Sequence, residues 1–154
     1  QENLEKIGYK KRIHLMNPMI PGLTGSKMSS SDRASVIGLL DDDKEVIKKM
    51  AKAYCLEGEI KDNGIMAFLK TVIFPVLHDK KKSFLIERDK KYGGNAEFKS
   101  YEDLEKAYAK KELHPNDLKN AVAKELNKLL EPMRKSYNSN KKIQFVAKMA
   151  YPEG

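Results

Sequence analysis

Apolar side chains recur every three or four residues over the last third of the chain, and this spacing predicts one long helix with a single buried face. The helix is expected to begin at His114-Pro115, because a proline in the first turn loses no helical hydrogen bond. The apolar positions are Leu118, Val122, Leu126, Leu129, Leu130 and Met133. The pattern continues past Pro132 to Tyr137, so we expect this proline to kink the helix rather than end it.

Four shorter runs with a helical period predict further helices, over 45–54, 65–77, 100–111 and 141–151. Pro75 is expected to close the second of them, because it cannot donate the next helical hydrogen bond. Two short apolar segments flank a turn that contains Gly93-Gly94, which predicts a β-hairpin with strands at 84–86 and 96–99. An apolar run at 12–16 suits a buried strand. The chain is therefore predicted to be mainly α, with α/β structure at its amino-terminal edge.

Composition limits the environments and sites that suit this chain. Thirty Lys and Arg against 22 Asp and Glu give a net charge of +8, which suits a polyanionic partner but also a simply lysine-rich surface. Cys55 is the single cysteine, so no intrachain disulfide can form, and we expect a buried thiol in a reducing compartment. No apolar run approaches the roughly 20 residues that span a bilayer, so a cytoplasmic protein without a membrane partner is expected.

Three adjacent aspartates, Asp41 to Asp43, precede the first predicted helix. We expect them to cap that helix, because a carboxylate there accepts hydrogen bonds from free backbone N–H groups. Three neighbouring aspartates at a helix start do not converge on one ion. No metal site is predicted.

A glycine- and serine-rich stretch, Pro21-Gly-Leu-Thr-Gly-Ser-Lys-Met-Ser-Ser-Ser-Asp32, has the composition of a phosphate-binding loop. Gly22 and Gly25 allow a tight turn that brings backbone N–H groups close to a ligand. Lys27 adds a compact positive charge, and the serines add hydroxyl donors with little bulk. The spacing does not fit the Walker pattern, and the same composition suits an exposed surface turn. Both interpretations stay open on the residues alone.

A second group of residues has the chemistry to recognise an unpaired base. Tyr92 lies in a glycine-flanked turn with Lys90 and Lys91 beside it, where its ring could stack on a base while the lysines meet phosphate. His114 and Asp117 lie three residues apart at a helix start and share a face. A carboxylate there can accept hydrogen bonds from guanine. The alternative is that Asp117 and His114 only stabilise the helix start and Tyr92 packs on the hairpin.

Two sets of motifs resemble one known family. Lys27-Met-Ser-Ser-Ser31 is similar to the second signature of class I aminoacyl-tRNA synthetases, in the form found in archaeal and eukaryotic tyrosyl-tRNA synthetases. Segments 88–95, 100–105 and 114–134 resemble the anticodon-binding region of the same family. The similarity extends over 13–151, and the chain is identified as the C-terminal half of such an enzyme. Ser31 stands where many class I enzymes carry a second lysine, so only Lys27 supplies the cation.

The resemblance implies a tyrosine–tRNA ligase, which uses ATP together with Mg²⁺ to make tyrosyl-adenylate and then transfers the tyrosyl group to tRNA-Tyr. It implies a catalytic role for Lys27. The residues implied in ATP binding are Gly25, Lys27, Met28, Ser29, Ser30 and Ser31. Those implied in anticodon binding are Arg88, Tyr92, His114 and Asp117.

The same resemblance divides the chain into the end of a Rossmann-like catalytic domain (1–40) and a helical anticodon-binding domain (41–154). The first class I signature and a tyrosine pocket are not found in this sequence, so we expect a piece of a longer protein that is inactive alone. The complete enzyme is expected to be a homodimer. The alternatives are an RNA-binding module that keeps the loop without activity, and a basic helical interaction protein.

Overall fold

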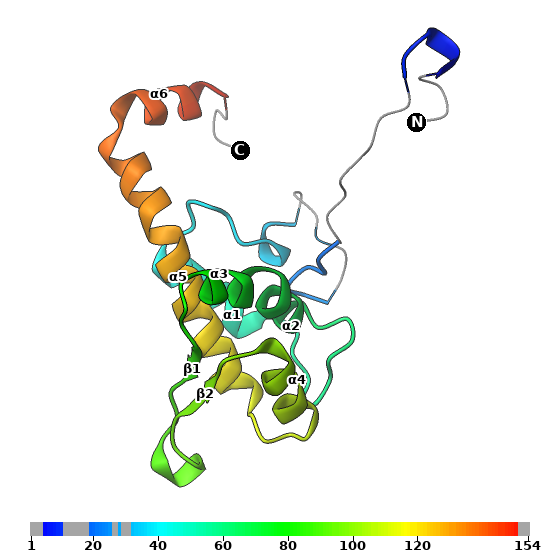
Figure 1. The fold of residues 1–154 in the computed structure, drawn as a ribbon. Helices are drawn as coiled ribbons and strands as arrows, with labels where there is room; N and C mark the ends of the chain where they lie inside the picture. The colour runs from blue at the N-terminus through cyan, green and yellow to red at the C-terminus, as the bar shows by residue number, and fades with distance from the viewer. Residues whose placement is uncertain (1–4, 11–18, 26–27, 29–31, 151–154) are drawn as a thin grey trace.

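The computed structural model describes residues 5–10, 19–25, 28 and 32–150, which form helices around one long helix and a short hairpin beside it (Figure 1). The helices are α1 (Asp43–Lys52), α2 (Gly64–Phe68), α3 (Phe74–Asp79), α4 (Tyr101–Ala109), α5 (Pro115–Ser139) and α6 (Lys141–Ala150). The strands are β1 (Phe84–Ile86) and β2 (Ala96–Phe98), and the short turns of helix are η1 (Glu5–Ile7), η2 (Arg33–Ser35), η3 (Leu69–Ile73) and η4 (Lys90–Tyr92). A mainly helical fold with one hairpin is confirmed, whereas the strand predicted at 12–16 lies outside the described residues.

The long helix α5 is the centre of the fold, and α1, η3 and β1 pack against it. Its buried face comprises Leu118, Ala121, Val122, Ala123, Leu126 and Leu130. The helix continues through Pro132, as predicted, but Met133 is 43% exposed. The carboxyl-terminal end of α5 therefore leaves the core, and α6 extends from it at the end of the molecule far from the hairpin (Figure 1).

None of the helices in the described ranges is long and apolar enough to cross a membrane.

The prediction that Pro75 closes its helix is wrong. The segments α2, η3 and α3 follow one another without a break from Gly64 to Asp79, and η3 is a π-helical turn. The Phe74 N–H donates to the Leu69 carbonyl, five residues back. This wider turn comes directly before Pro75, where a regular α-helix would need a proline N–H and would bring the ring against a carbonyl. The π turn thus lets the helix continue through the proline.

The hairpin has the predicted strands, and its pairing sets which side chains face the core. Phe84 pairs with Phe98 and Ile86 with Ala96. Phe84 and Ile86 are fully buried, while Leu85 between them is 41% exposed, the alternation expected of a strand covered on one face. The Phe74 ring lies 5.8 Å from that of Phe84, centroid to centroid, and joins the hairpin to α3.

The acidic run before α1 contains a helix cap, as predicted. Asp42 is the N-cap residue and accepts a hydrogen bond from the Glu45 N–H at 2.7 Å. Asp41 instead pairs with Lys49 of α1, with 2.6 Å between the carboxylate and Nζ. Within the described ranges, no cluster of His, Cys, Asp and Glu side chains could hold a metal ion. Cys55 is buried, as predicted, and lies 3.1 Å from the Tyr108 hydroxyl.

Candidate nucleic-acid interface

The four residues predicted to bind an anticodon line one pocket. Its volume is about 410 Å³, within the range of roughly 300–1,000 Å³ typical of small-ligand sites. The pocket is formed by the η4 turn, the start of α5 and the loop before it. Its lining residues are Glu57, Arg88, Tyr92, Lys111, Glu112, His114, Asn116 and Asp117. We call this set the base pocket.

Tyr92 lies on the hairpin turn, and most of its surface is exposed. Its side chain is 64% exposed, and the Lys91 Nζ lies 4.8 Å from the ring centroid. The turn is fixed by two glycines in the left-handed region, Gly93 (φ 93°) and Gly94 (φ 71°), where a side chain would strain the backbone. A rigid turn therefore presents a largely exposed aromatic ring next to a cation.

His114 and Asp117 lie at the start of α5. Of the two side chains, only that of His114 caps the helix. The Asn116 N–H donates to His114 Nδ1 at 3.2 Å, so His114 is the N-cap residue. Because Nδ1 is the acceptor, the neutral ring carries its proton on Nε2, which is left as a donor. Asp117 is half-buried. Among the described residues, none forms a hydrogen bond or an ion pair with the Asp117 carboxylate. This carboxylate can therefore accept hydrogen bonds from a ligand.

Arg88 holds the two walls of the base pocket together. Its Nε donates to the Gly94 carbonyl and its Nη1 donates to the Glu112 carbonyl, both at 3.0 Å. The first bond reaches the turn that carries Tyr92. The second reaches the loop that leads into His114. The backbone N–H of Arg88 also donates to the Asn95 side chain at 3.1 Å, which closes the base of the turn.

Four lining residues were not predicted from the sequence. Glu112 and Lys111 lie in the loop before α5, and Asn116 directly precedes Asp117 in the motif. Glu57 comes from the segment after α1, more than thirty positions before Tyr92. Lys111 follows the C-cap of α4 in the left-handed region at φ 62°, a position where glycine is usual, so the lysine gave no sequence signal. For Glu57 no local signal exists.

The glycine- and serine-rich loop is only partly described. Ser26, Lys27, Ser29, Ser30 and Ser31 lie outside the described residues. Gly25 has φ 80°, the left-handed conformation expected of a tight turn, and a Cβ there would contact the Tyr54 ring at 3.3 Å. Met28 is half-buried and packs against the core.

The base of this loop is anchored in the helical core. Leu23 is fully buried, and its N–H donates to the Ser35 carbonyl at 3.0 Å. The Tyr54 N–H in turn donates to the Leu23 carbonyl at 2.6 Å. Gly64, at the start of α2, lies so close to Gly22 that a Cβ would meet its carbonyl oxygen at 2.6 Å. The segments on both sides of the predicted ATP residues are thus tied to each other and to the helices.

Comparisons with known proteins agree on one family. The model of the family "tRNA synthetases class I (W and Y)" matches residues 1–131. The protein named "Tyrosine–tRNA ligase, cytoplasmic" from Gallus gallus is 50% identical over 152 residues, which cover 99% of this chain and 28% of the relative. The protein of the same name from Saccharomyces cerevisiae is 44% identical, with 99% of this chain and 40% of the relative covered.

Solved structures give the same result. Tyrosyl-tRNA synthetase from Aeropyrum pernix matches with a TM-score of 0.81 and 28% identity, over 99% of this chain and 43% of that one. The enzyme from Archaeoglobus fulgidus, solved as a complex with L-tyrosine, matches with a TM-score of 0.77 and 42% identity, over 87% of this chain and 40% of that one. The chain thus spans well under half the length of these relatives.

Proposed function

The chain belongs to the class I tRNA synthetases of the tryptophan and tyrosine group, and we propose that it is the part of a tyrosine–tRNA ligase that carries the ATP loop and reads the anticodon. The complete enzyme joins ATP and tyrosine into tyrosyl-adenylate, releases pyrophosphate, and transfers the tyrosyl group to tRNA-Tyr. The observation that carries the proposal is the base pocket, because it gathers an exposed ring, an imidazole donor and a free carboxylate within one cavity.

In this proposal the base pocket binds the first base of the anticodon, a guanine. The Tyr92 ring stacks on the unpaired base, which contributes roughly 1–3 kcal/mol for an aromatic platform. The Asp117 carboxylate accepts hydrogen bonds from the guanine N1–H and N2–H₂ groups. Adenine presents an acceptor at N1, so the carboxylate would face a lone pair and lose both bonds. The His114 Nε2–H is a further donor at the edge of the site.

The loop has the second role in this proposal. Lys27 neutralises the charge that develops on the leaving pyrophosphate, and Mg²⁺ accompanies the ATP. Gly25, Met28 and the serines Ser29 to Ser31 hold the nucleotide through backbone groups and hydroxyls. Support comes from the anchored base of the loop, where the hydrogen bond from the Leu23 N–H to the Ser35 carbonyl holds the two ends of the segment together. The tyrosine pocket and the dimer contact are assigned to the part of the relatives that this chain does not cover.

The test compares tyrosine tRNA transcripts that differ only in the first anticodon base. The complete protein is expected to bind the guanine transcript 10- to 100-fold more tightly than the other three, about 1–3 kcal/mol for a good bidentate contact. Asp117→Ala should abolish this preference, while Asp79→Ala, the same change at an exposed aspartate of α3, should keep it. Filter-binding titrations measure both. An Asp117→Ala protein that still prefers guanine would contradict the assignment.

A second prediction concerns Arg88, which acts on the base pocket by positioning its walls. Arg88→Met keeps an unbranched apolar stem but removes both hydrogen bonds to the Gly94 and Glu112 carbonyls. Since hydrogen bonds of charged groups contribute about 1.5–3 kcal/mol each, we expect the guanine preference to fall roughly 10-fold. Arg33→Met, at an exposed arginine of η2, is the matched control. Equal preference in Arg88→Met and the unmodified protein would show that the walls hold without this residue.

A further inference from the structure

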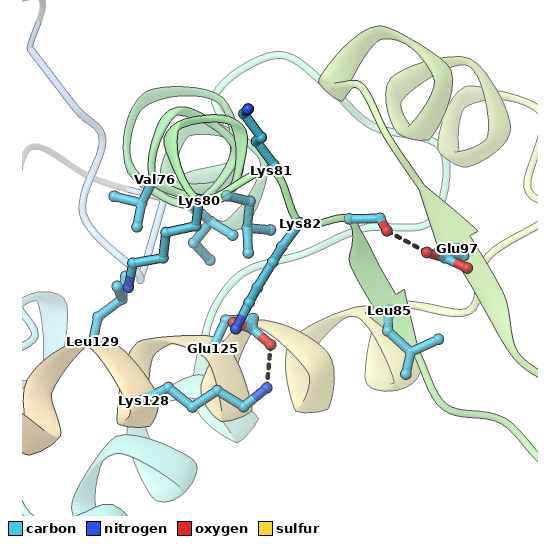
Figure 2. Close-up of a pocket in the computed structure, with 12 residues that line it drawn as sticks. Val76, Lys80, Lys81, Lys82, Leu85, Glu97, Glu125, Lys128 and Leu129 are labelled. Carbon is cyan, nitrogen blue, oxygen red and sulfur yellow. Dashed lines mark hydrogen bonds and ion pairs between the residues drawn. The ribbon is translucent and has the colours of Figure 1, made fainter.

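A second cleft, of about 570 Å³, lies between the turn after α3 and the middle of α5 (Figure 2). We call it the lysine cleft and define it by Lys80, Lys82, Lys128, Glu97 and Glu125. Figure 2 shows Lys80 and Lys82 extending from the turn toward α5, while Lys81 between them points away from that helix. Ammonium groups from two separate elements thus converge on one cavity.

Both acidic residues of the lysine cleft already have partners. The Ser83 hydroxyl donates to the Glu97 carboxylate. Lys128 Nζ lies 2.6 Å from the Glu125 carboxylate. Within the part of the chain that the structure describes, the Lys80 and Lys82 ammonium groups form no hydrogen bond and no ion pair. Like charges in one cleft repel each other, so an anion bound between these lysines would be stabilised.

The turn that carries the two lysines has a fixed conformation. The Lys81 N–H donates to the His78 carbonyl and the Lys82 N–H to the Leu77 carbonyl, both at 2.9 Å. Lys81 itself is in the left-handed region at φ 52°. One cation at a helix end complements the helix dipole. That effect does not require two lysines directed across the cleft toward a third on α5.

The lysine cleft and the base pocket lie at the two ends of one surface. Leu85 of β1 and Lys128 of α5 both line the cleft. Further along, Glu87 pairs with Lys124 at 2.6 Å, and Arg88 then reaches the loop before α5. The hairpin therefore runs along α5 from one site to the other. Asp117 and Lys128 are three helical turns apart, about 16 Å at 1.5 Å per residue.

We propose that the lysine cleft binds backbone phosphates of the same RNA whose base enters the base pocket, a few nucleotides along the strand. This inference rests on the proposed function, which brings an RNA within three helical turns of the cleft. The compact, flexible ammonium of lysine suits a phosphate rather than a base edge. Contacts to phosphate position an RNA and carry no sequence information. The lysine cleft therefore adds affinity, and the base pocket selects the base.

The test measures tRNA affinity as a function of salt concentration, with the complete protein and the tyrosine tRNA transcripts described above. Each phosphate contact contributes about 0.7–0.9 to the slope of log K against log salt. The double variant Lys80→Gln/Lys82→Gln is expected to lower that slope by about 1 to 2 and to weaken binding 3- to 10-fold at low salt. The loss should be equal for guanine and non-guanine transcripts. Lys106→Gln, the same change at an exposed lysine of α4 outside the lining of the cleft, should leave the slope unchanged.

Two results would overturn the inference: an unchanged salt slope in the double variant, or a loss of affinity confined to the guanine transcript. The Asp117→Ala protein is expected to show the opposite result: it loses the preference for the guanine transcript and keeps the slope of log K against log salt. Should the unmodified protein show no guanine preference while the double variant still lowers the slope, the base pocket assignment fails and the cleft stands as a backbone site. Circular dichroism of each variant verifies that the fold is intact.

Discussion

Replacing Lys27 by alanine is expected to lower kcat for tyrosine-dependent ATP–pyrophosphate exchange by about 10²- to 10³-fold in the complete enzyme, which is the usual effect of removing one group that stabilises developing charge. The KM for ATP should change far less. Negative charge grows on the pyrophosphate as its bond to the α-phosphate breaks, so we expect the proposed interaction with Lys27 to be stronger in the transition state than in the bound substrate. Ser31 is neutral, and the motif therefore has no second lysine that could compensate.

The control for this prediction is Lys44→Ala, which removes the same charge from an exposed position on α1 and should leave both kinetic constants unchanged. The separate changes in kcat and in KM distinguish two roles for Lys27. A raised KM with an unchanged kcat would mean that the lysine only helps to hold ATP in the ground state. That result would contradict the catalytic assignment but would keep the loop as a nucleotide site.

Local rules predicted the elements whose boundaries depend on neighbouring residues. The repeat of three and four residues set α5, and the Gly93-Gly94 turn set the hairpin. Ser100 caps α4 through the Asp103 N–H, as its spacing in the sequence predicts. Each of these features is decided within a few residues, where hydrogen-bond geometry and backbone preference leave few alternatives.

The same rules failed where packing decides the outcome. Pro75 should end a helix, but Phe74 and Leu77 on either side of it are buried, and a π turn keeps them in the core. Met133 continues the apolar repeat of α5 but is 43% exposed. A sequence pattern shows which face of a helix can be buried, whereas tertiary structure decides how far along the helix a partner extends.

The base pocket contains residues that the sequence predicts and hydrogen bonds that it does not predict. Tyr92, His114 and Asp117 follow from the chemistry of two short motifs, and the structure brings them into one cavity. The bonds from Arg88 to the Gly94 and Glu112 carbonyls could not be predicted, because they depend on the approach of the hairpin to the loop before α5. The sequence thus names the groups that can face a ligand, while the framework that orients them is a property of the fold.

The second large effect is expected at Leu23, which anchors the base of the loop that we propose to bind ATP. Leu23→Ala should lower the free energy of unfolding by about 2–5 kcal/mol, the range for truncating a fully buried leucine. The cavity would lie between the start of α2 and the backbone bonds to Ser35 and Tyr54. Urea unfolding followed by far-UV circular dichroism measures the loss, and Leu39→Ala, the same truncation at a side chain 64% exposed, is the control.

Because Leu23 joins the loop to the helical core, its truncation should also affect the chemistry. Loosened ends let the loop sample more conformations, so fewer of them place Lys27 correctly, and we expect kcat to fall while tRNA discrimination by the distant base pocket is kept. Hydrogen exchange of the Leu23 and Tyr54 amides, which form the bonds at the base of the loop, should become faster than in Leu39→Ala. A stable Leu23→Ala protein with unchanged exchange at both amides would mean that the backbone bonds alone hold the loop, and that the leucine side chain only fills space.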